Sequence, residues 1–172
     1  MKKTEILPSN VLKSTLLVGF LMGATACSAS ETSALEFYAV YQDANGETIS
    51  IEDSSLELPD NVEFFGNRTR DGEGLYVISP PAIDESCLAD IWAGEHPQAE
   101  YPILEFKFTE SCAEEFTKFT GDNIGRQMAV ILNGELFTAP RINGAINADG
   151  MFIEGGFESM AEVEALAASF KD

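Results

Sequence analysis

The alternation of apolar and polar residues is clearest in the second half of the chain, where it predicts strands. Between residues 101 and 109, apolar Leu104, Phe106 and Phe108 alternate with polar residues. A period of two is typical of a strand with one buried face. A further strand is expected near "MFIEGGF", residues 151–157, where the paired glycines indicate a bulge or a close approach of backbone.

The segment from residue 123 to residue 142 reads "NIGRQMAVILNGELFTAPRI". Apolar runs on both sides of Asn133-Gly134 predict a β-hairpin, because a type I′ turn needs positive φ at both central residues. Pro140 removes a ladder donor, so the second strand is expected to lie at a sheet edge or to end there. An edge strand could accept an extended peptide by β-augmentation, although Pro140 and Arg141 could equally blunt that edge.

Three segments place apolar residues at the i, i+3, i+4 spacing of an amphipathic helix. They are residues 84–94, 111–121 and 159–170. The second and third begin with an S-x-x-E capping box, formed by Ser111 with Glu114 and by Ser159 with Glu162. Asp84 is the expected N-cap of the first.

The pattern is weaker in the first half of the chain. Residues 35–41 and 47–52 are predicted to form a hairpin around the turn "QDANG", residues 42–46. Residues 53–74 are rich in turn formers and are predicted to be mostly loop, and "LYVIS", residues 75–79, is a short strand.

These elements predict an α+β fold, a mainly antiparallel sheet with helices packed on one face. We expect residues 74–172 to form this domain. Residues 35–73 are expected to be a hairpin and loop-rich N-terminal part, either extra edge strands or a loosely packed extension. The 172 residues are enough for one compact domain with its own core.

The start of the chain predicts an export signal over residues 1–26. Lys2 and Lys3 supply positive charge, and "STLLVGFLMGATA", residues 14–26, is an uncharged and largely apolar stretch of 13 residues. A transmembrane helix needs about 20 such residues. The stretch is therefore interpreted as a cleaved signal and not as a permanent span.

The signal ends in "ATAC", residues 24–27. This fits ordinary A-x-A cleavage, and it also resembles the lipobox of bacterial lipoproteins, although Ala24 stands where that box usually has leucine. We expect lipidation of Cys27 with residues 27–34 as a tether; the alternative is a plain secreted protein. Within lipoproteins, Ser28 in place of aspartate favours the outer membrane over the inner, so the predicted location is the periplasm-facing bacterial envelope.

Acidic residues outnumber basic ones, and the formal net charge is −19. After residue 26 the chain has 7 basic and 28 acidic residues, which gives 7 − 28 = −21. Such a charge repels nucleic acid phosphates and anionic lipid headgroups, so we expect no nucleic acid partner and membrane contact through the acyl anchor only. It suits basic partners, or it is simply a solvated acidic surface.

No residue pattern indicates catalysis, a metal or a cofactor. The single histidine, His96, precedes a proline in a predicted loop, where a solvent-exposed filler is the usual role. The sequence has no H-x-x-x-H, C-x-x-C, G-x-S-x-G or P-loop motif. We therefore predict a protein that is not an enzyme and needs no cofactor.

Cys87 and Cys112 are the two cysteines that remain once Cys27 is lipidated, and an oxidising compartment favours their pairing. Each falls in the first turn of a predicted helix. If strands 75–79 and 103–108 run parallel through a crossover, these first turns are neighbours. We predict a disulfide; the alternative is a pair of buried free thiols.

Residues 116–170 resemble the head subdomain of SecD, a subunit of the protein-export translocase. That family shows a phenylalanine-containing helix, a threonine, N-[IV]-G-[KR], an apolar strand with DG or NG, then SAP-x-I and I-x-G-x-F. The matching residues here are Thr120, Asn123, Ile124, Gly125, Arg126, Asn133, Gly134, Thr138, Ala139, Pro140, Ile142, Ile153, Gly156, Phe157, Leu166 and Ala167. The resemblance extends more loosely back to Leu75, and it implies a SecD-head fold in which these residues have structural roles.

The resemblance also implies a module that contacts translocating polypeptide. SecD proteins resemble proton-driven export machines with several membrane helices, a feature that this sequence does not supply. We therefore expect a non-enzymatic envelope lipoprotein whose interaction module takes a polypeptide or envelope protein as partner, as an accessory in protein export or envelope maintenance. The alternative is a stand-alone binding lipoprotein for a small molecule or an envelope polymer unrelated to export.

Overall fold

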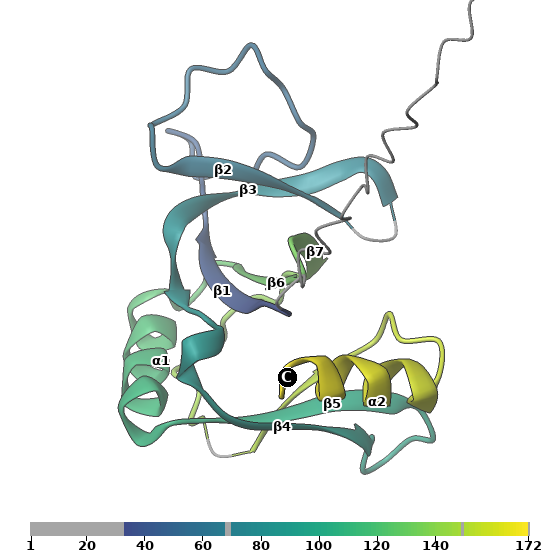
Figure 1. Ribbon diagram of the computed structural model, residues 1–172. Helices are drawn as coiled ribbons and strands as arrows, with labels where there is room; N and C mark the ends of the chain where they lie inside the picture. The colour runs from purple at the N-terminus through teal and green to yellow at the C-terminus, as the bar shows by residue number, and fades with distance from the viewer. Residues whose placement is uncertain (1–32, 68–69, 149, 172) are drawn as a thin grey trace, which may run out of the picture. The chain divides into compact units, whose positions relative to one another are not determined.

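A computed structural model of the chain describes residues 33–67, 70–148 and 150–171 (Figure 1). The predicted export signal, Cys27 and most of the predicted tether lie outside the described residues. Within the described ranges, no helix is both long enough and apolar enough to cross a membrane.

Five strands form a closed barrel in the order β1-β3-β2-β7-β6. They are β1 (Leu35–Val40), β2 (Val62–Asn67), β3 (Arg70–Ile83), β6 (Met128–Leu132) and β7 (Glu135–Thr138). β3 has 14 residues, and this length lets it pair antiparallel with β2 through its first part and with β1 through its second. β2 and β7 are the parallel neighbours, which meet at Asn67 and Leu136.

Three strands form a second, antiparallel sheet in the order β4-β5-β8. They are β4 (Leu88–Glu95), β5 (Pro102–Phe108) and β8 (Met151–Glu154), and a 3₁₀ turn, η1 (Glu85–Cys87), leads into β4. Helix α2 (Met160–Ser169) packs against β4 and β5, and α1 (Glu110–Asp122) contacts β3 and β5. In Figure 1, α2 lies on the side of β4 and β5 that faces the barrel strands.

Strands β1 and β6 are buried on both faces, since each separates two hydrophobic clusters. On β6, Ala129 and Ile131 lie in the cluster inside the barrel, whereas Met128, Val130 and Leu132 lie in the cluster shared with the second sheet and both helices. A strand that is buried on both faces needs a continuous apolar run. This explains why "MAVIL" does not alternate.

The α+β class and the predominance of antiparallel pairing are confirmed, but the arrangement differs from the expected one. The described residues form two sheets instead of one, and α1 contacts a strand of each. The predicted helix over residues 84–94 is wrong, because η1 and β4 occupy that segment.

The predicted hairpin over residues 35–52 is also wrong. β1 is paired on both sides, by β3 and β6, so residues 47–52 have no edge of β1 to join. The turn at 42–46 does form, with Asp43 accepting hydrogen bonds from the backbone of Asn45 and Glu47. Within the segment predicted to be mostly loop, residues 62–67 and 70–74 belong to β2 and β3.

Two of the three predicted caps are confirmed. Asp84 is the N-cap of η1, and its side chain accepts from Ser86 N at 2.9 Å, although the helix predicted after it is a 3₁₀ turn and a strand. At α2, Ser159 Oγ accepts from Glu162 N, and the Glu162 carboxylate accepts from Glu158 N at 2.7 Å. At α1 the N-cap is Thr109, so the capping box predicted at Ser111 is wrong.

Candidate functional site

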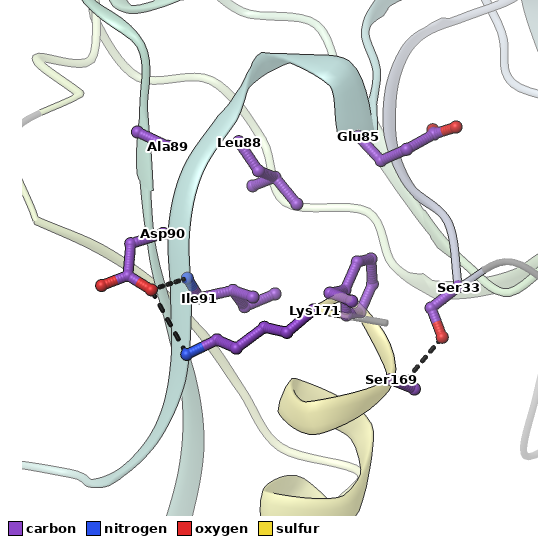
Figure 2. Close-up of a pocket in the computed structure, with 9 residues that line it drawn as sticks. Ser33, Glu85, Leu88, Ala89, Asp90, Ile91, Ser169 and Lys171 are labelled. Carbon is purple, nitrogen blue, oxygen red and sulfur yellow. Dashed lines mark hydrogen bonds and ion pairs between the residues drawn. The ribbon is translucent and has the colours of Figure 1, made fainter.

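A hollow of about 370 Å³ lies between β4 and the last turn of α2 (Figure 2). Its polar groups contact one another. Lys171 Nζ lies 3.4 Å from Asp90 Oδ1, and the Ser33 hydroxyl donates to Ser169 Oγ at 2.5 Å. The first contact joins the segment after α2 to β4, and the second joins the start of the domain to α2. Because both contacts connect elements of the domain, we assign the hollow a structural role.

The motif at residues 123–126 forms the connection between α1 and β6. The Asn123 side chain donates to Phe119 O at 2.9 Å and closes the end of α1. Gly125 has φ of 86°, in the left-handed region that side chains disfavour. The Arg126 guanidinium donates to Val40 O at 3.3 Å and joins the connection to β1.

The motif at residues 139–142 lies beside this connection. Gly125 N donates to Ile142 O at 2.7 Å, and Ile142 N donates to Arg126 O at 2.8 Å. The side chain of Gln127 donates to Ala139 O at 3.1 Å. Two segments of the sequence motif are therefore held together by hydrogen bonds between them.

Pro140 follows the end of β7, which stops at Thr138. β7 is paired with β6 on one side and meets β2 on the other within the closed barrel. The prediction that the strand ends at Pro140 is confirmed. The alternative of a free edge for β-augmentation at this strand is wrong, because closure of the barrel removes that edge.

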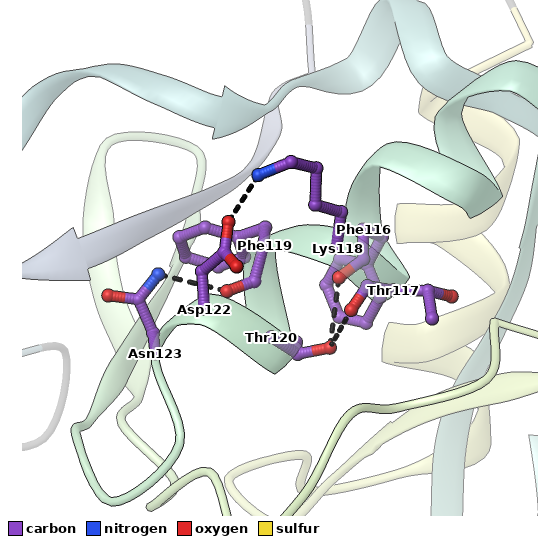
Figure 3. A network of polar contacts seen from close by, with 7 residues as sticks. All are labelled: Phe116, Thr117, Lys118, Phe119, Thr120, Asp122 and Asn123. Atoms are coloured by element: carbon purple, nitrogen blue, oxygen red, sulfur yellow. Dashed lines mark hydrogen bonds and ion pairs between the residues drawn. The ribbon is translucent and has the colours of Figure 1, made fainter.

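Thr120 connects α1 to the segment that follows the hairpin, within the helix shown in Figure 3. Its side chain is fully buried. Its hydroxyl donates to Phe116 O at 2.9 Å and accepts from Ile146 N at 2.9 Å. One turn earlier, the Thr117 hydroxyl lies 3.0 Å from Ile146 O and contributes a second bond to the same residue.

The remaining motif residues also have structural roles. Asn133 and Gly134 have φ of 51° and 80°, as the predicted hairpin turn requires. Asn133 also exchanges hydrogen bonds with Ala34, at 3.0 Å and 2.9 Å. Gly156 has φ of 74°, and a Cβ there would lie 3.2 Å from the ring of Phe137.

The disulfide predicted between Cys87 and Cys112 is present, with a Cα–Cα distance of 5.6 Å. The predicted route to it is wrong, because the strands concerned lie in different sheets. β4 and β5 run antiparallel and place Leu88 opposite Phe108. The residues just before β4 and just after β5 are therefore neighbours.

The second sheet has one face directed into the core and one directed away from it. Ile91, Leu104 and Ile153 belong to the core cluster that includes residues of α2. On the opposite face, the strand register gives two cross-strand rows. They are Trp92, Glu105 and Phe152, and then Gly94, Ile103 and Glu154. We call this surface, with His96 and Tyr101 at its end, the outer face.

Aromatic rings gather at the end of the outer face. His96 and Tyr101 stack with ring centroids 4.7 Å apart, and Phe152 meets His96 edge-on at 5.6 Å. Phe152 and Tyr101 are 42% and 37% exposed, whereas Ile103 on the same face is 1% exposed. The outer face is thus an aromatic surface with a buried aliphatic residue among its side chains.

Glu154 joins the aromatic groups through its carboxylate. Tyr101 Oη donates to Glu154 Oε2 at 2.6 Å, and His96 Nε2 lies 3.4 Å from the same oxygen. The hydrogen bond to Glu154 raises the pKa of Tyr101. The His96 side chain is only 16% exposed, so the prediction of a solvent-exposed filler is wrong.

Sequence reasoning missed the outer face, although a signal for it exists. "DIWAG" and "MFIE" each alternate, so Trp92 and Phe152 point away from Ile91 and Ile153. The helix predicted over residues 84–94 concealed the first alternation.

Among the described residues, no three His, Cys, Asp or Glu side chains are grouped in a way that could hold a metal ion.

Comparison with known proteins identifies related sequences and folds. The family model described as "SecDF, P1 head subdomain" matches residues 62–171. The protein translocase subunit SecD of Rickettsia typhi is 30% identical over 128 residues, which are 74% of this chain and 24% of the relative. The protein translocase subunit SecDF of Thermus thermophilus is 31% identical over 140 residues, which are 80% of this chain and 18% of the relative.

Solved structures agree with these matches. One described as "Structure and function of a membrane component SecDF that enhances protein export" has a TM-score of 0.57 and 26% identity, over 81% of this chain and 62% of that chain. A second, "Crystal structure of SecDF in Super-membrane-facing form", has a TM-score of 0.56, and the match covers 19% of that chain. This chain therefore spans about a quarter or less of the length of these two translocase subunits.

Proposed function

The chain belongs to the family of SecDF P1 head subdomains, and from this premise we propose that it is an envelope lipoprotein that contacts polypeptides as an accessory in protein export. The observation that carries the proposal is the family match over residues 62–171, which extends from β2 to the end of α2. The named relatives are protein translocase subunits, and the SecDF of one similar solved structure is described as enhancing protein export. The proposed role is binding, with no reaction catalysed.

The proposed anchor is a lipid on Cys27, with the domain facing the periplasm and the outer membrane favoured over the inner. The small residues that abut Cys27 support this modification. The far end of the proposed tether already contacts the domain, since Ser33 is 7% exposed and is bonded to Ser169. The tether would therefore be short, and the domain would work near the membrane surface.

Deletion of the gene in its own host tests the role in export. Pulse labelling should show slower processing of exported precursor proteins in the deletion strain, and the intact gene supplied in trans should restore the rate. Normal processing in the deletion strain would contradict the proposal. A bound small molecule or envelope polymer in the purified protein, together with normal export, would favour the alternative of a binding lipoprotein unrelated to export.

The variant Cys27→Ser separates the anchor from the domain. We expect mass spectrometry of the natural protein to find a diacylglyceryl group on Cys27, and the serine variant to fractionate with soluble proteins. Ser28→Ala changes the neighbouring residue and leaves Cys27 in place, so it is the matched control and should fractionate with membranes. An unmodified Cys27 in protein that fractionates as soluble would contradict the anchor.

A further inference from the structure

The outer face is a surface of exposed aromatic side chains on an antiparallel sheet. Phe152 and Tyr101 are more than a third exposed, and both contact the largely buried ring of His96. β8 lies at one end of the strand order β4-β5-β8, so its outward edge is a sheet edge. A sheet edge can accept an extended peptide through backbone hydrogen bonds, with side-chain contacts on the adjacent face.

The charges on this face are mainly negative. Glu105 and Glu154 lie in its cross-strand rows, and Asp90 pairs in register with Lys107. Glu95 and Glu100 lie at the ends of its strands. The basic side chain in the described part of these strands is Lys107. The Glu105 side chain extends over Gly94 on the neighbouring strand. A Cβ added at that glycine would lie 2.0 Å from Glu105 Oε1.

The face already holds one cation against an aromatic ring. Lys107 Nζ lies 5.6 Å from the centroid of Trp92. Rings of this kind attract ammonium and guanidinium groups through their quadrupole. Nearby carboxylates attract the same cations by their charge. The exposed rings of Tyr101 and Phe152 lie beside Glu154 and offer the same chemistry to a group from outside.

We propose that the outer face binds a cationic, extended polypeptide segment, with a lysine or arginine side chain over the rings of Tyr101 and Phe152 and its charge beside Glu154. This inference rests on the proposed function and names the class of polypeptide that the domain takes. Charge complementarity selects this occupant, because the chain has a formal net charge of −19 and the face is rich in carboxylates.

Fluorescence anisotropy with the full chain in detergent micelles tests the proposal. The probe is a labelled peptide of alternating lysine and leucine, and the comparison peptide has glutamate in place of every lysine. We expect the lysine peptide to bind more tightly, and its affinity to fall as salt is added because the contact is partly electrostatic.

Two variants locate the contact. Phe152→Ala should weaken binding of the lysine peptide about two- to fivefold, as loss of an exposed cation–π contact implies. Glu154→Gln should weaken it to a similar extent and reduce its salt dependence. The matched controls are Ile51→Ala, where the side chain is 65% exposed elsewhere on the domain, and Glu57→Gln in an exposed segment. Both controls should bind like the unaltered chain.

Several results would overturn the inference. They are equal affinity of the chain for the two peptides, no binding of the lysine peptide, and unchanged affinity for that peptide in both variants. Coverage of the outer face by a second copy of the chain would overturn it as well. Circular dichroism of each variant establishes that it is folded. If Phe152→Ala and Glu154→Gln restore export in the deletion strain as fully as the intact gene does, the inference fails while the proposed function stands. If the deletion strain exports normally, the proposed function fails whatever the peptides show.

Discussion

The hydroxyl of Thr120 accepts a hydrogen bond from the backbone N–H of Ile146 and thereby fastens the segment before β8 to α1. Thr120→Val keeps the shape of the side chain and removes the acceptor. The Ile146 N–H would then lack this partner at a part-buried site, and an unpaired donor that is shielded from water typically costs about 1–3 kcal/mol. We expect the free energy of unfolding to fall by that amount, as measured by urea denaturation.

Thr120→Ser is the control, because serine keeps the hydroxyl and removes a methyl group. Its expected cost is about 1 kcal/mol, from lost apolar burial. The Ser variant should therefore be clearly more stable than the Val variant. Equal stability of the two would show that the hydrogen bond is not what holds the segment.

The Cys87–Cys112 disulfide should contribute to stability, because it restricts the unfolded chain. The two cysteines are 25 residues apart, and the chain-entropy account gives on the order of 3 kcal/mol for a loop of this size. Replacing both cysteines by alanine should lower the denaturation midpoint of the protein accordingly. Non-reducing peptide mapping of protein from its own envelope should recover the linked pair, and free-thiol labelling at both positions would contradict the bridge.

Glu36 on β1 should destabilise the fold at neutral pH. Burial raises the pKa of its carboxyl above the ordinary value of 4.5, and the nearby carboxylates of Glu85, Asp84 and Glu63 raise it further, whereas a hydrogen bond with Tyr38 opposes them. Because the folded-state pKa is the higher one, the stabilising effect of protonation is fully present below about pH 4.5 and is lost as pH rises through the folded-state pKa.

Glu36→Gln removes this titration. We expect the variant to have a higher melting temperature than the natural protein at neutral pH, and the gain to shrink as the pH approaches 4.5. Glu57→Gln, at an exposed position, should change the melting temperature little at any pH. A gain from Glu36→Gln that is constant across this range would contradict the assigned cause.

The parts of the fold that could be predicted from the sequence are those set by local contacts. The turn at Asn133-Gly134 needs only two residues with positive φ, and the capping of α2 needs only Ser159 and Glu162. The alternation on β5 reports directly on one buried face. Each of these signals lies within a few residues, so the rest of the fold does not alter it.

The parts that could not be predicted depend on distant contacts. Leu88, Ile91 and Trp92 have helical spacing, yet they lie on a strand because β5 pairs with that segment along its length. β1 resembles one arm of a hairpin, but β6, far along the chain, takes one of its edges. The outer face is assembled from β4, β5 and β8, so its aromatic cluster becomes visible only when their register is known.

Gly74 lies on β3 at a point where β2 leaves no room for a side chain. It pairs in register with Gly66, and a Cβ at Gly74 would lie 2.2 Å from the carbonyl oxygen of Phe65 and 2.5 Å from the ring of Phe64. The carbonyl is backbone and cannot rotate away. Gly74→Ala must therefore shift β2 relative to β3, and overpacking of this kind typically costs about 1–3 kcal/mol.

Gly66→Ala is the matched control on the opposing strand. A Cβ at Gly66 would meet no atom within 4 Å, and its φ is not in the positive range, so the added methyl group restricts the unfolded chain without a clash. We expect Gly74→Ala to lower the free energy of unfolding by about 1–3 kcal/mol and Gly66→Ala to leave it unchanged or slightly raised. Denaturation of both variants by urea measures the difference. If the two substitutions have the same effect, the close packing of β2 on β3 at Gly74 is not what limits side-chain size in this part of the barrel.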